Sequence, residues 1–409
     1  MAGALALTGV VVAWQVLVTT GSVQAVDPAG ASVITGSARQ TAGMLRFAQE
    51  NIAAPEGSRD WGKVREAATA VLANKPLESD ALTALGLAQE GEGDSAGASR
   101  TIQTAGERSL RNTPAHLWLF VAAINEKRYE DAIGHIDVSL RLSSDLRSEV
   151  KNGLLTMTAD PEGAAALARH LAQDPPWRTW LLNTLGREKG FDNALQGIYA
   201  SLNQSSTPVR EDELRSYLNR LLNERNYPQA YLAWRSFAPG GTQNDRRYLS
   251  NGDFTQRLGT LPFDWKIERF PNYEITLERS PDNARNRLRI QFGIGRIATR
   301  YISKLVVLPP GDYTFAGASE SRELRLKSGG LAWTLTCLGN GPDLAASPVT
   351  TATTARAAFS VPFTVPATNC PAQILRLEAY PRPGSDTVAN WGNAYYDSLR
   401  IDRVTAASN

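Results

Sequence analysis

The sequence has few of the side chains that most often carry catalysis or bind metals. It contains only three histidines (His116, His135 and His170) and two cysteines among 409 residues. No histidine stands at a spacing typical of a zinc site or a nucleophile–base pair, and no Gly-x-Ser-x-Gly or His-Glu-x-x-His motif occurs. Paired carboxylates meet in space and leave no such pattern. We therefore predict that the protein is not an enzyme, with an accessory glycan hydrolase or lyase as one alternative.

Charged side chains are missing from the start of the chain, where the first one is Asp27. Residues 2–19 form a largely apolar run, typical of a signal peptide or a single membrane-spanning helix. No Lys or Arg precedes this run, and a buried first helix is the alternative. We assign residues 1–26 to a signal peptide or transmembrane anchor. The rest of the chain is expected in the periplasm, anchored to the inner membrane or exported.

The chain also lacks a dense basic stripe, which argues against nucleic acid as a partner. Its net charge is +2, and residues 245–409 carry 20 Lys+Arg against 15 Asp+Glu. That mild excess is compatible with an acidic polymer. A length of 409 residues with 42% hydrophobic side chains indicates a globular protein of two or three domains.

A repeat of 34 residues occupies the first half of the chain. Similar residues recur at this interval, with one copy containing Leu82, Leu85, Gly86, Ala98, Ile102 and Ala105, and the next containing His116, Leu119, Phe120, Ala132, Ile136 and Ser139. Further copies start near Pro175 and Glu211, and degenerate ones lie near 39–75 and 145–174. This pattern resembles the tetratricopeptide repeat (TPR) family. The resemblance implies an α-helical solenoid over residues 39–240 whose groove docks a protein partner, although a spacer is the alternative.

After residue 245 the pattern changes to short alternating runs bounded by Gly, Pro, Asn and Asp. Such runs predict strands, including "YEITLE", "RLRIQF", "DYTFAG", "ELRLKS", "LAWTLTC" and "QILRLEA". Nine or so short strands are typical of an antiparallel β-sandwich. The fold class we expect is thus multidomain α + β, with a TPR-like solenoid followed by a sandwich over residues 246–405.

Three motifs in order give this second domain a family resemblance. They are Asn251-Gly252-Asp253-Phe254, then Pro310-Gly311-Asp312-Tyr313, then a late Asp397. In this order they resemble the galactose-binding-like jelly roll shared by many carbohydrate-binding modules. The resemblance implies a structural calcium bound by Asp253 and Asp397, the one cofactor that we consider. Thr255 replaces an expected acidic ligand, and turn hydrogen bonds are the other role for these aspartates.

The second domain also contains both cysteines and a candidate sugar-binding tryptophan. Cys337 and Cys370 are predicted to form a disulfide in an oxidising compartment, with two buried thiols as the alternative. Trp391 follows a Gly- and Asn-rich stretch that we interpret as a loop before the last strand. Sugars bind aromatic faces beside fixed polar groups. The residues proposed for carbohydrate binding are therefore Trp391, Asn390, Asn393 and Tyr395, unless Trp391 fills the core.

Together these features predict a non-enzymatic envelope protein. The sandwich would bind polysaccharide, and the repeats would dock onto a partner protein. By resemblance alone, this pairing suggests assembly or export of an exopolysaccharide or capsule. A purely structural protein–protein adaptor is the second alternative.

Overall fold

The structure is a computed structural model of the whole chain. It describes residues 43, 46–48, 50–52, 54–239, 248–269, 271–293, 296–298, 300–326, 330–339, 343–380 and 387–404. The contacts divide the chain into two compact units. Unit 1 comprises residues 1–181 and 188–208, and unit 2 comprises residues 182–187 and 209–409. The predicted signal or anchor segment, residues 1–26, lies outside the described residues. Within the described part of the chain, no helix is both long enough and apolar enough to cross a membrane.

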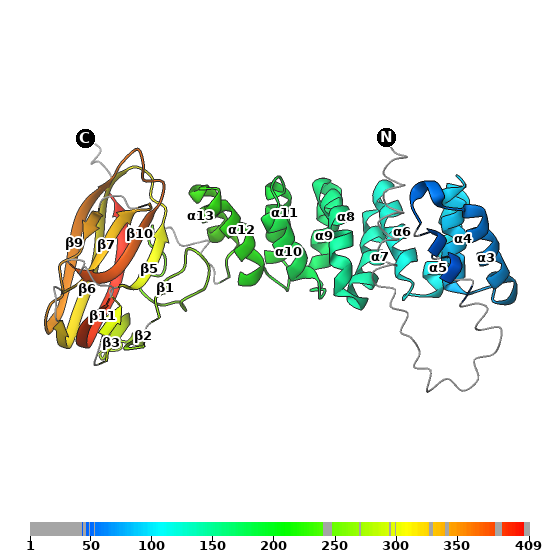
Figure 1. Cartoon of the computed structure of the whole chain (residues 1–409). Helices are drawn as coiled ribbons and strands as arrows, with labels where there is room; N and C mark the ends of the chain where they lie inside the picture. Colours follow the sequence, from blue (N-terminus) through cyan, green and yellow to red (C-terminus); the bar gives the residue numbers. More distant parts are fainter. Residues whose placement is uncertain are drawn as a thin grey trace, which may run out of the picture. The chain divides into compact units, whose positions relative to one another are not determined.

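Unit 1 is built from antiparallel helical hairpins (Figure 1). Its helices are α3 (Trp61–Asn74), α4 (Ser79–Gly91), α5 (Ser95–Arg108), α6 (Thr113–Asn125), α7 (Tyr129–Leu142), α8 (Arg147–Ala159), α9 (Pro161–Leu171) and α11 (Asp192–Asn203). The residues of α10 (Arg178–Arg187) are divided between the two units. A short 3-10 helix, η1, covers Glu56–Ser58, and a second, η2, covers Ser144–Leu146. The helices occur where the 34-residue repeat predicted them, and the degenerate copy near 145–174 is a regular hairpin.

Small residues allow the two helices of a hairpin to approach closely. A Cβ added to Gly86 on α4 would lie 2.4 Å from the Ile102 side chain on α5. Successive hairpins are joined by Asn112, which caps α6 by accepting a hydrogen bond from the Ala115 amide (3.0 Å). The same side chain donates to Thr83 Oγ1 on α4 at 2.8 Å. This contact joins two neighbouring hairpins, as stacked repeats require.

Two histidines of unit 1 lie side by side, and we expect them to make its stability depend on pH. The Nδ1 atoms of His116 (α6) and His135 (α7) lie 3.2 Å apart, and burial is the main cause that lowers the pKa of both imidazoles. The unfolded chain, with an ordinary histidine pKa of about 6.5, therefore binds protons more readily. We expect the free energy of unfolding of unit 1 to be highest above pH 7 and to fall as the pH drops below 6.5.

Circular dichroism of thermal unfolding between pH 7.5 and 5.5 measures this dependence. The variant His135→Gln removes one titrating group and the repulsion between two imidazoliums. It should show a flatter profile than the unaltered chain over the same range. An equal slope in both proteins would mean that the histidine pair does not govern the pH response.

Unit 2 contains the last helical hairpin as well as the strands. The hairpin is formed by α12 (Glu211–Asn223) and α13 (Tyr227–Phe237). Trp234 of α13 packs on Phe263 at 5.7 Å between ring centroids, and Arg215 of α12 donates to the Thr260 carbonyl at 2.9 Å. Helical structure ends where the composition shift predicted it. The compact unit nevertheless begins earlier, because these contacts tie α12 and α13 to the segment that precedes the first strand.

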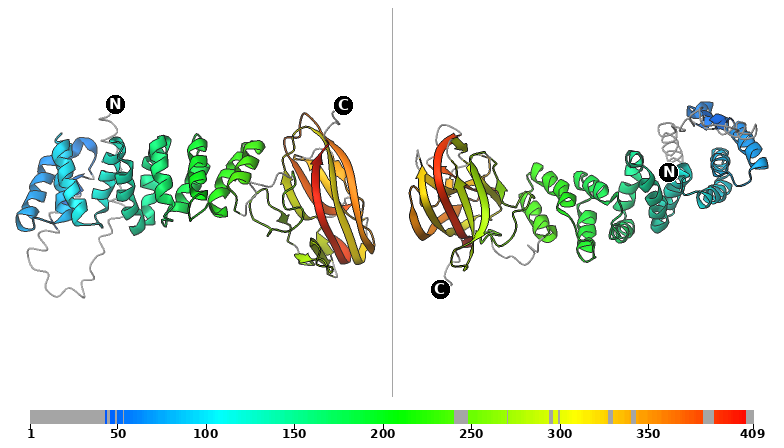
Figure 2. Two further views of the ribbon diagram at one scale, coloured as in Figure 1. Left: turned by 180° about the vertical axis from the view of Figure 1, so that it is seen from behind. Right: turned by 90° about the horizontal axis from the view of Figure 1, so that it is seen from below.

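The strands of unit 2 form two antiparallel sheets (Figures 1 and 2). The five-stranded sheet has the order β1-β5-β10-β7-β8, and the six-stranded sheet has the order β2-β3-β11-β6-β9, with β4 paired to β11. The strands are β1 (Lys266–Ile267), β2 (Tyr273–Arg279), β3 (Asn286–Phe292), β4 (Arg296–Ala298), β5 (Arg300–Val306), β6 (Gly311–Leu326), β7 (Gly330–Cys337), β8 (Asp343–Ala346), β9 (Thr354–Val365), β10 (Gln373–Tyr380) and β11 (Thr387–Arg403). The chain is therefore a helical solenoid followed by an antiparallel β-sandwich, as predicted.

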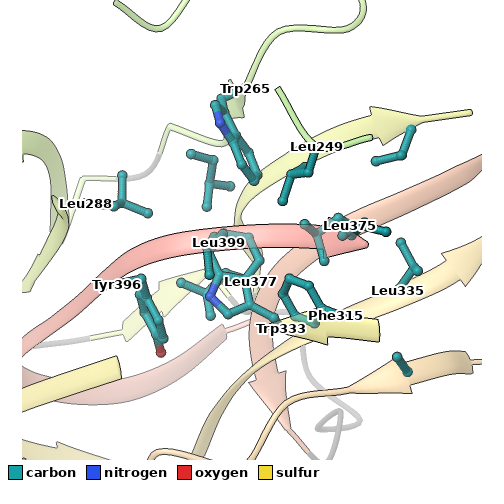
Figure 3. Close-up of a cluster of buried hydrophobic side chains, with 14 of the residues drawn as sticks. Leu249, Trp265, Leu288, Phe315, Trp333, Leu335, Leu375, Leu377, Tyr396 and Leu399 are labelled. Atoms are coloured by element: carbon teal, nitrogen blue, oxygen red, sulfur yellow. The ribbon is translucent and has the colours of Figure 1, made fainter. Parts of the chain in front are cut away.

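The core of the sandwich lies between the two sheets. Leu377 of β10 and Leu399 of β11 are buried there with Trp333, whose exposed fraction is 0%, and Figure 3 shows the side chains of this cluster. Trp265 is also buried, and its indole N–H donates to the Asn251 carbonyl at 2.9 Å. The expectation that Trp265 and Trp333 belong to the core is confirmed. They are among the largest fully buried side chains that the structure describes, so each removes much apolar surface from water.

Three sequence interpretations need correction here. The resemblance to the galactose-binding-like jelly roll implies that "NGDF" starts the first strand, but Asn251 and Phe254 both have positive φ angles, of 50° and 53°, and the stretch forms a turn. The runs "DYTFAG" and "ELRLKS" predict two strands, yet the first run and Glu323–Leu326 of the second both fall in β6, which continues past a positive φ of 55° at Glu323. Trp391 was placed in a loop, whereas β11 already begins at Thr387.

Candidate functional site

The face of the six-stranded sheet that points away from the core carries a row of polar and aromatic side chains. Along β11, Ala394 (0% exposed) and Tyr396 (1% exposed) point into the core. Because successive side chains of a strand alternate between the two faces, Asn393 and Tyr395 point outward. Directly paired residues of neighbouring strands share a face. The outward residues next to this row are Arg287, Arg289 and Gln291 on β3 and Glu320, Arg322 and Arg325 on β6.

Trp391 is the large aromatic side chain of this outer face that remains open to solvent. Its side chain is 44% exposed, so it does not fill the core. It pairs with Arg325 of β6, and the next pair along the strand is Asn393 with Arg322. The pairing shifts between the two because Glu323 and Leu324 of β6 both lie opposite Gly392, whose φ is 99°, so β6 carries a bulge here. Trp391 and Asn393 are two residues apart on β11, and both therefore lie on the outward face.

Tyr395 lies in the same row but is only 7% exposed. The guanidinium carbon of Arg287 lies 3.9 Å from its ring centroid, and that of Arg322 lies at 5.6 Å. Arg287 in turn donates to Glu278 Oε1 at 2.8 Å and to Glu320 Oε2 at 3.2 Å. The faces of the Tyr395 ring are thus occupied by cations, and this residue supports the row instead of offering a stacking surface.

Asn393 is held in one orientation by its neighbours on β3. Arg289 donates to Asn393 Oδ1 at 3.1 Å and to Gln291 Oε1 at 2.7 Å. Fixed amide and guanidinium groups next to an open indole are the components that recognise sugar hydroxyls and C–H surfaces. The sequence had indicated Asn393 but missed Arg289 and Arg325, because arginines in an alternating strand are typical of any solvated sheet face. Asn390, also proposed from the sequence, pairs through its backbone with Leu326 of β6.

The two aspartates considered for calcium already have protein partners. Asp397 on β11 accepts two hydrogen bonds from Arg356 of β9, at 3.0 and 2.7 Å. Asp253 accepts from the Thr255 hydroxyl at 3.0 Å. Among the described residues, no cluster of three or more His, Cys, Asp or Glu side chains could hold a metal ion. The hydrogen-bonding role that the sequence left open is the one that these contacts support.

A cavity of about 450 Å³ lies elsewhere in unit 2, where α13 meets the start of the sandwich. Its lining includes Glu211 and Asp264, and burial is the main cause that raises the pKa of Asp264. Asp264 accepts a hydrogen bond from the Leu261 amide at 2.8 Å, and Glu211 accepts one from the Thr260 hydroxyl. Both carboxylates therefore stabilise the turn that connects the hairpin to β1.

Unit 1 has a groove of its own, with a cavity of about 600 Å³ between α9 and α11. Mostly small side chains line it, including Ala164, Ala168, Ala194 and Gly197, with Phe191 partly exposed at one end. Small residues leave room beside the helices for another chain.

The comparisons with known proteins find likeness among solved structures only. No protein-family model matches the chain, and no curated protein matches it by sequence. One similar structure is TmCBM61 in complex with β-1,4-galactotriose, at 13% identity and a TM-score of 0.27, covering 39% of this chain and 99% of that one. Another is the CBM22-1 xylan-binding domain of Xyn10C from Paenibacillus barcinonensis, at 15% identity and a TM-score of 0.24, covering 35% and 87%.

A third is the carbohydrate-binding module CBM6cm-2 of Cellvibrio mixtus lichenase 5A in complex with cellotriose. It has 14% identity and a TM-score of 0.21, covering 32% of this chain and 88% of that one. At such identities and TM-scores, neither the ligand nor the activity of these modules passes to this chain. The C-terminal part of the chain is an antiparallel two-sheet sandwich by its own strand pairing, and is similar in this to carbohydrate-binding modules.

Proposed function

We propose that the sandwich binds a polysaccharide on the outer face of its six-stranded sheet, without cleaving it. The observation that carries the proposal is the 44% exposed side chain of Trp391 on β11. The exposed part of this indole is apolar surface that the fold leaves in contact with water. It is suited to stack on the C–H face of a sugar ring.

The polar neighbours of Trp391 supply the second requirement for sugar recognition. Asn393, Gln291 and Arg289 form a hydrogen-bonded row beside it. Because these groups are already ordered, a sugar that replaces water at their remaining donors and acceptors loses little side-chain entropy. A long polymer could lie along β11 across several such groups.

The substitution Trp391→Ala tests this proposal. Loss of the stacking surface should weaken binding roughly tenfold, a free-energy change of about 1.4 kcal/mol. Affinity electrophoresis of the full chain against a panel of neutral and acidic polysaccharides measures it. Val404→Ala is the matched control, since Val404 is also an exposed apolar residue (53%) just beyond β11. Equal retardation of both variants would place the site away from Trp391.

For unit 1 we propose docking of a protein partner, supported by the groove of about 600 Å³ between α9 and α11. A chain with a docking unit and a sugar-binding sandwich could hold a polysaccharide near the machinery that makes or exports it. An exopolysaccharide or capsule in the cell envelope fits this pairing, as does the apolar run at residues 2–19. Pull-down of partners with unit 1 residues altered at Ala168 and Ala194 to Glu tests the docking role.

A further inference from the structure

We propose that the polysaccharide bound at Trp391 is acidic and that Arg325 pairs with a carboxylate of its sugar units. This inference rests on the proposed sugar-binding function and names the class of sugar. Arg325 lies directly across from Trp391 in the β11–β6 pairing. A sugar stacked on the indole would therefore place its ring substituents next to this guanidinium.

Arg325 differs from the other arginines of the outer face in having no partner among the residues that the structure describes. It is exposed, and it makes no hydrogen bond or ion pair with any part of the chain that the structure describes. Arg289, by contrast, donates to Asn393 and Gln291, and Arg322 donates to Glu320 at 2.7 Å. A guanidinium with all its donors available can bind a carboxylate through two parallel hydrogen bonds.

Arg325 is the cation beside Trp391 that is unpaired among the described residues. With the exposed Glu274 and Glu323 counted, this face carries four arginines and four carboxylates, so the arithmetic is four minus four, or zero. The other three arginines, Arg287, Arg289 and Arg322, are ion-paired with two of the carboxylates. Those carboxylates, Glu278 and Glu320, are both bonded to Arg287, which is only 6% exposed. Their negative charge is thus neutralised inside the network.

Two more acidic side chains, Glu274 on the edge strand β2 and Glu323 at the β6 bulge, are exposed near this network. Glu323 is two residues from Arg325 and would oppose the approach of an anionic sugar. The two residues therefore predict changes in affinity of opposite direction. Removing the charge of Arg325 should weaken binding of an acidic polymer, and removing that of Glu323 should strengthen it. A site for neutral sugars would respond to neither change in this way.

The experiment compares the full chain with the variants Arg325→Gln and Glu323→Gln by affinity electrophoresis and titration calorimetry. The probes are polygalacturonate, alginate and hyaluronate, with fully methyl-esterified polygalacturonate as the uncharged match. We expect binding to at least one acidic polymer, weaker binding in 0.5 M NaCl, and roughly fivefold weaker binding for Arg325→Gln. Glu323→Gln should bind about twofold more tightly. The affinity for the methyl ester should be the same for the unaltered chain and for both variants.

The outcomes separate this inference from the proposed function. Trp391-dependent binding of neutral glycans alone would retain the sugar site and overturn the acidic assignment. Equal affinity of Arg325→Gln and the unaltered chain for the acidic polymers would also overturn it. Binding to no glycan at all would overturn both proposals.

Discussion

Removal of the Cys337–Cys370 disulfide should lower the free energy of unfolding of the sandwich by about 4 kcal/mol. The bridge joins residues 33 apart in the sequence, and closing a loop of this length reduces the entropy of the unfolded chain by about that amount at 25 °C. In the folded state, Cys337 ends β7 and pairs across the ladder with Gln373 of β10, so the strands are already neighbours. The stabilisation therefore comes largely from the unfolded state.

Denaturant unfolding of the double variant C337A/C370A measures this effect. The fluorescence of the buried Trp265 and Trp333 reports the sandwich transition. Addition of a reducing agent to the unaltered chain should produce a similar loss, and it should change the double variant no further. A loss below about 1 kcal/mol in the variant would mean that the unfolded sandwich retains enough structure to replace the bridge.

The disulfide was predictable from the sequence, whereas the position of Trp391 was not. Two cysteines in a chain with an export-like start allow only one pairing. The stretch before Trp391 contains Gly, Ser, Asp and Asn, which are typical of loops. The sequence therefore predicted a loop where β11 begins. The bulge on β6, where Glu323 and Leu324 lie opposite Gly392, also breaks the alternation by which the neighbouring strand is recognised. A conformation that depends on a positive φ at one glycine leaves no periodic signal.

The supporting network of the site was hidden for another reason. Arg287, Glu278 and Glu320 lie on three different strands, and no spacing along the chain indicates that β11 brings β3 and β6 to its two sides. The helical repeat, in contrast, was predictable, because each hairpin repeats the same local contacts at a fixed interval. Contacts between residues that are near each other in the sequence can be predicted from it more easily than contacts between strands that are far apart in the sequence.

Gly392→Ala should destabilise the sandwich by about 3 kcal/mol and displace Trp391. The φ of Gly392 is 99°, a region that costs an alanine about 1 kcal/mol. An added Cβ would also lie only 2.3 Å from the Glu323 carbonyl oxygen on β6. Backbone cannot move aside as a flexible side chain would, so the pairing of β11 with β6 must shift. The affinity for polysaccharide should fall together with the stability, because the bulge sets the direction of the indole.

Gly339→Ala separates the two causes. Gly339 has nearly the same φ, 94°, but a Cβ there would meet no atom within 4 Å. This variant should lose only about 1 kcal/mol, the conformational part, and should keep its affinity for polysaccharide. Denaturant unfolding of both variants gives the difference, which is the contribution of the contact with β6. If the two losses are equal, the strands relax without cost, and the bulge does not hold Trp391 in place.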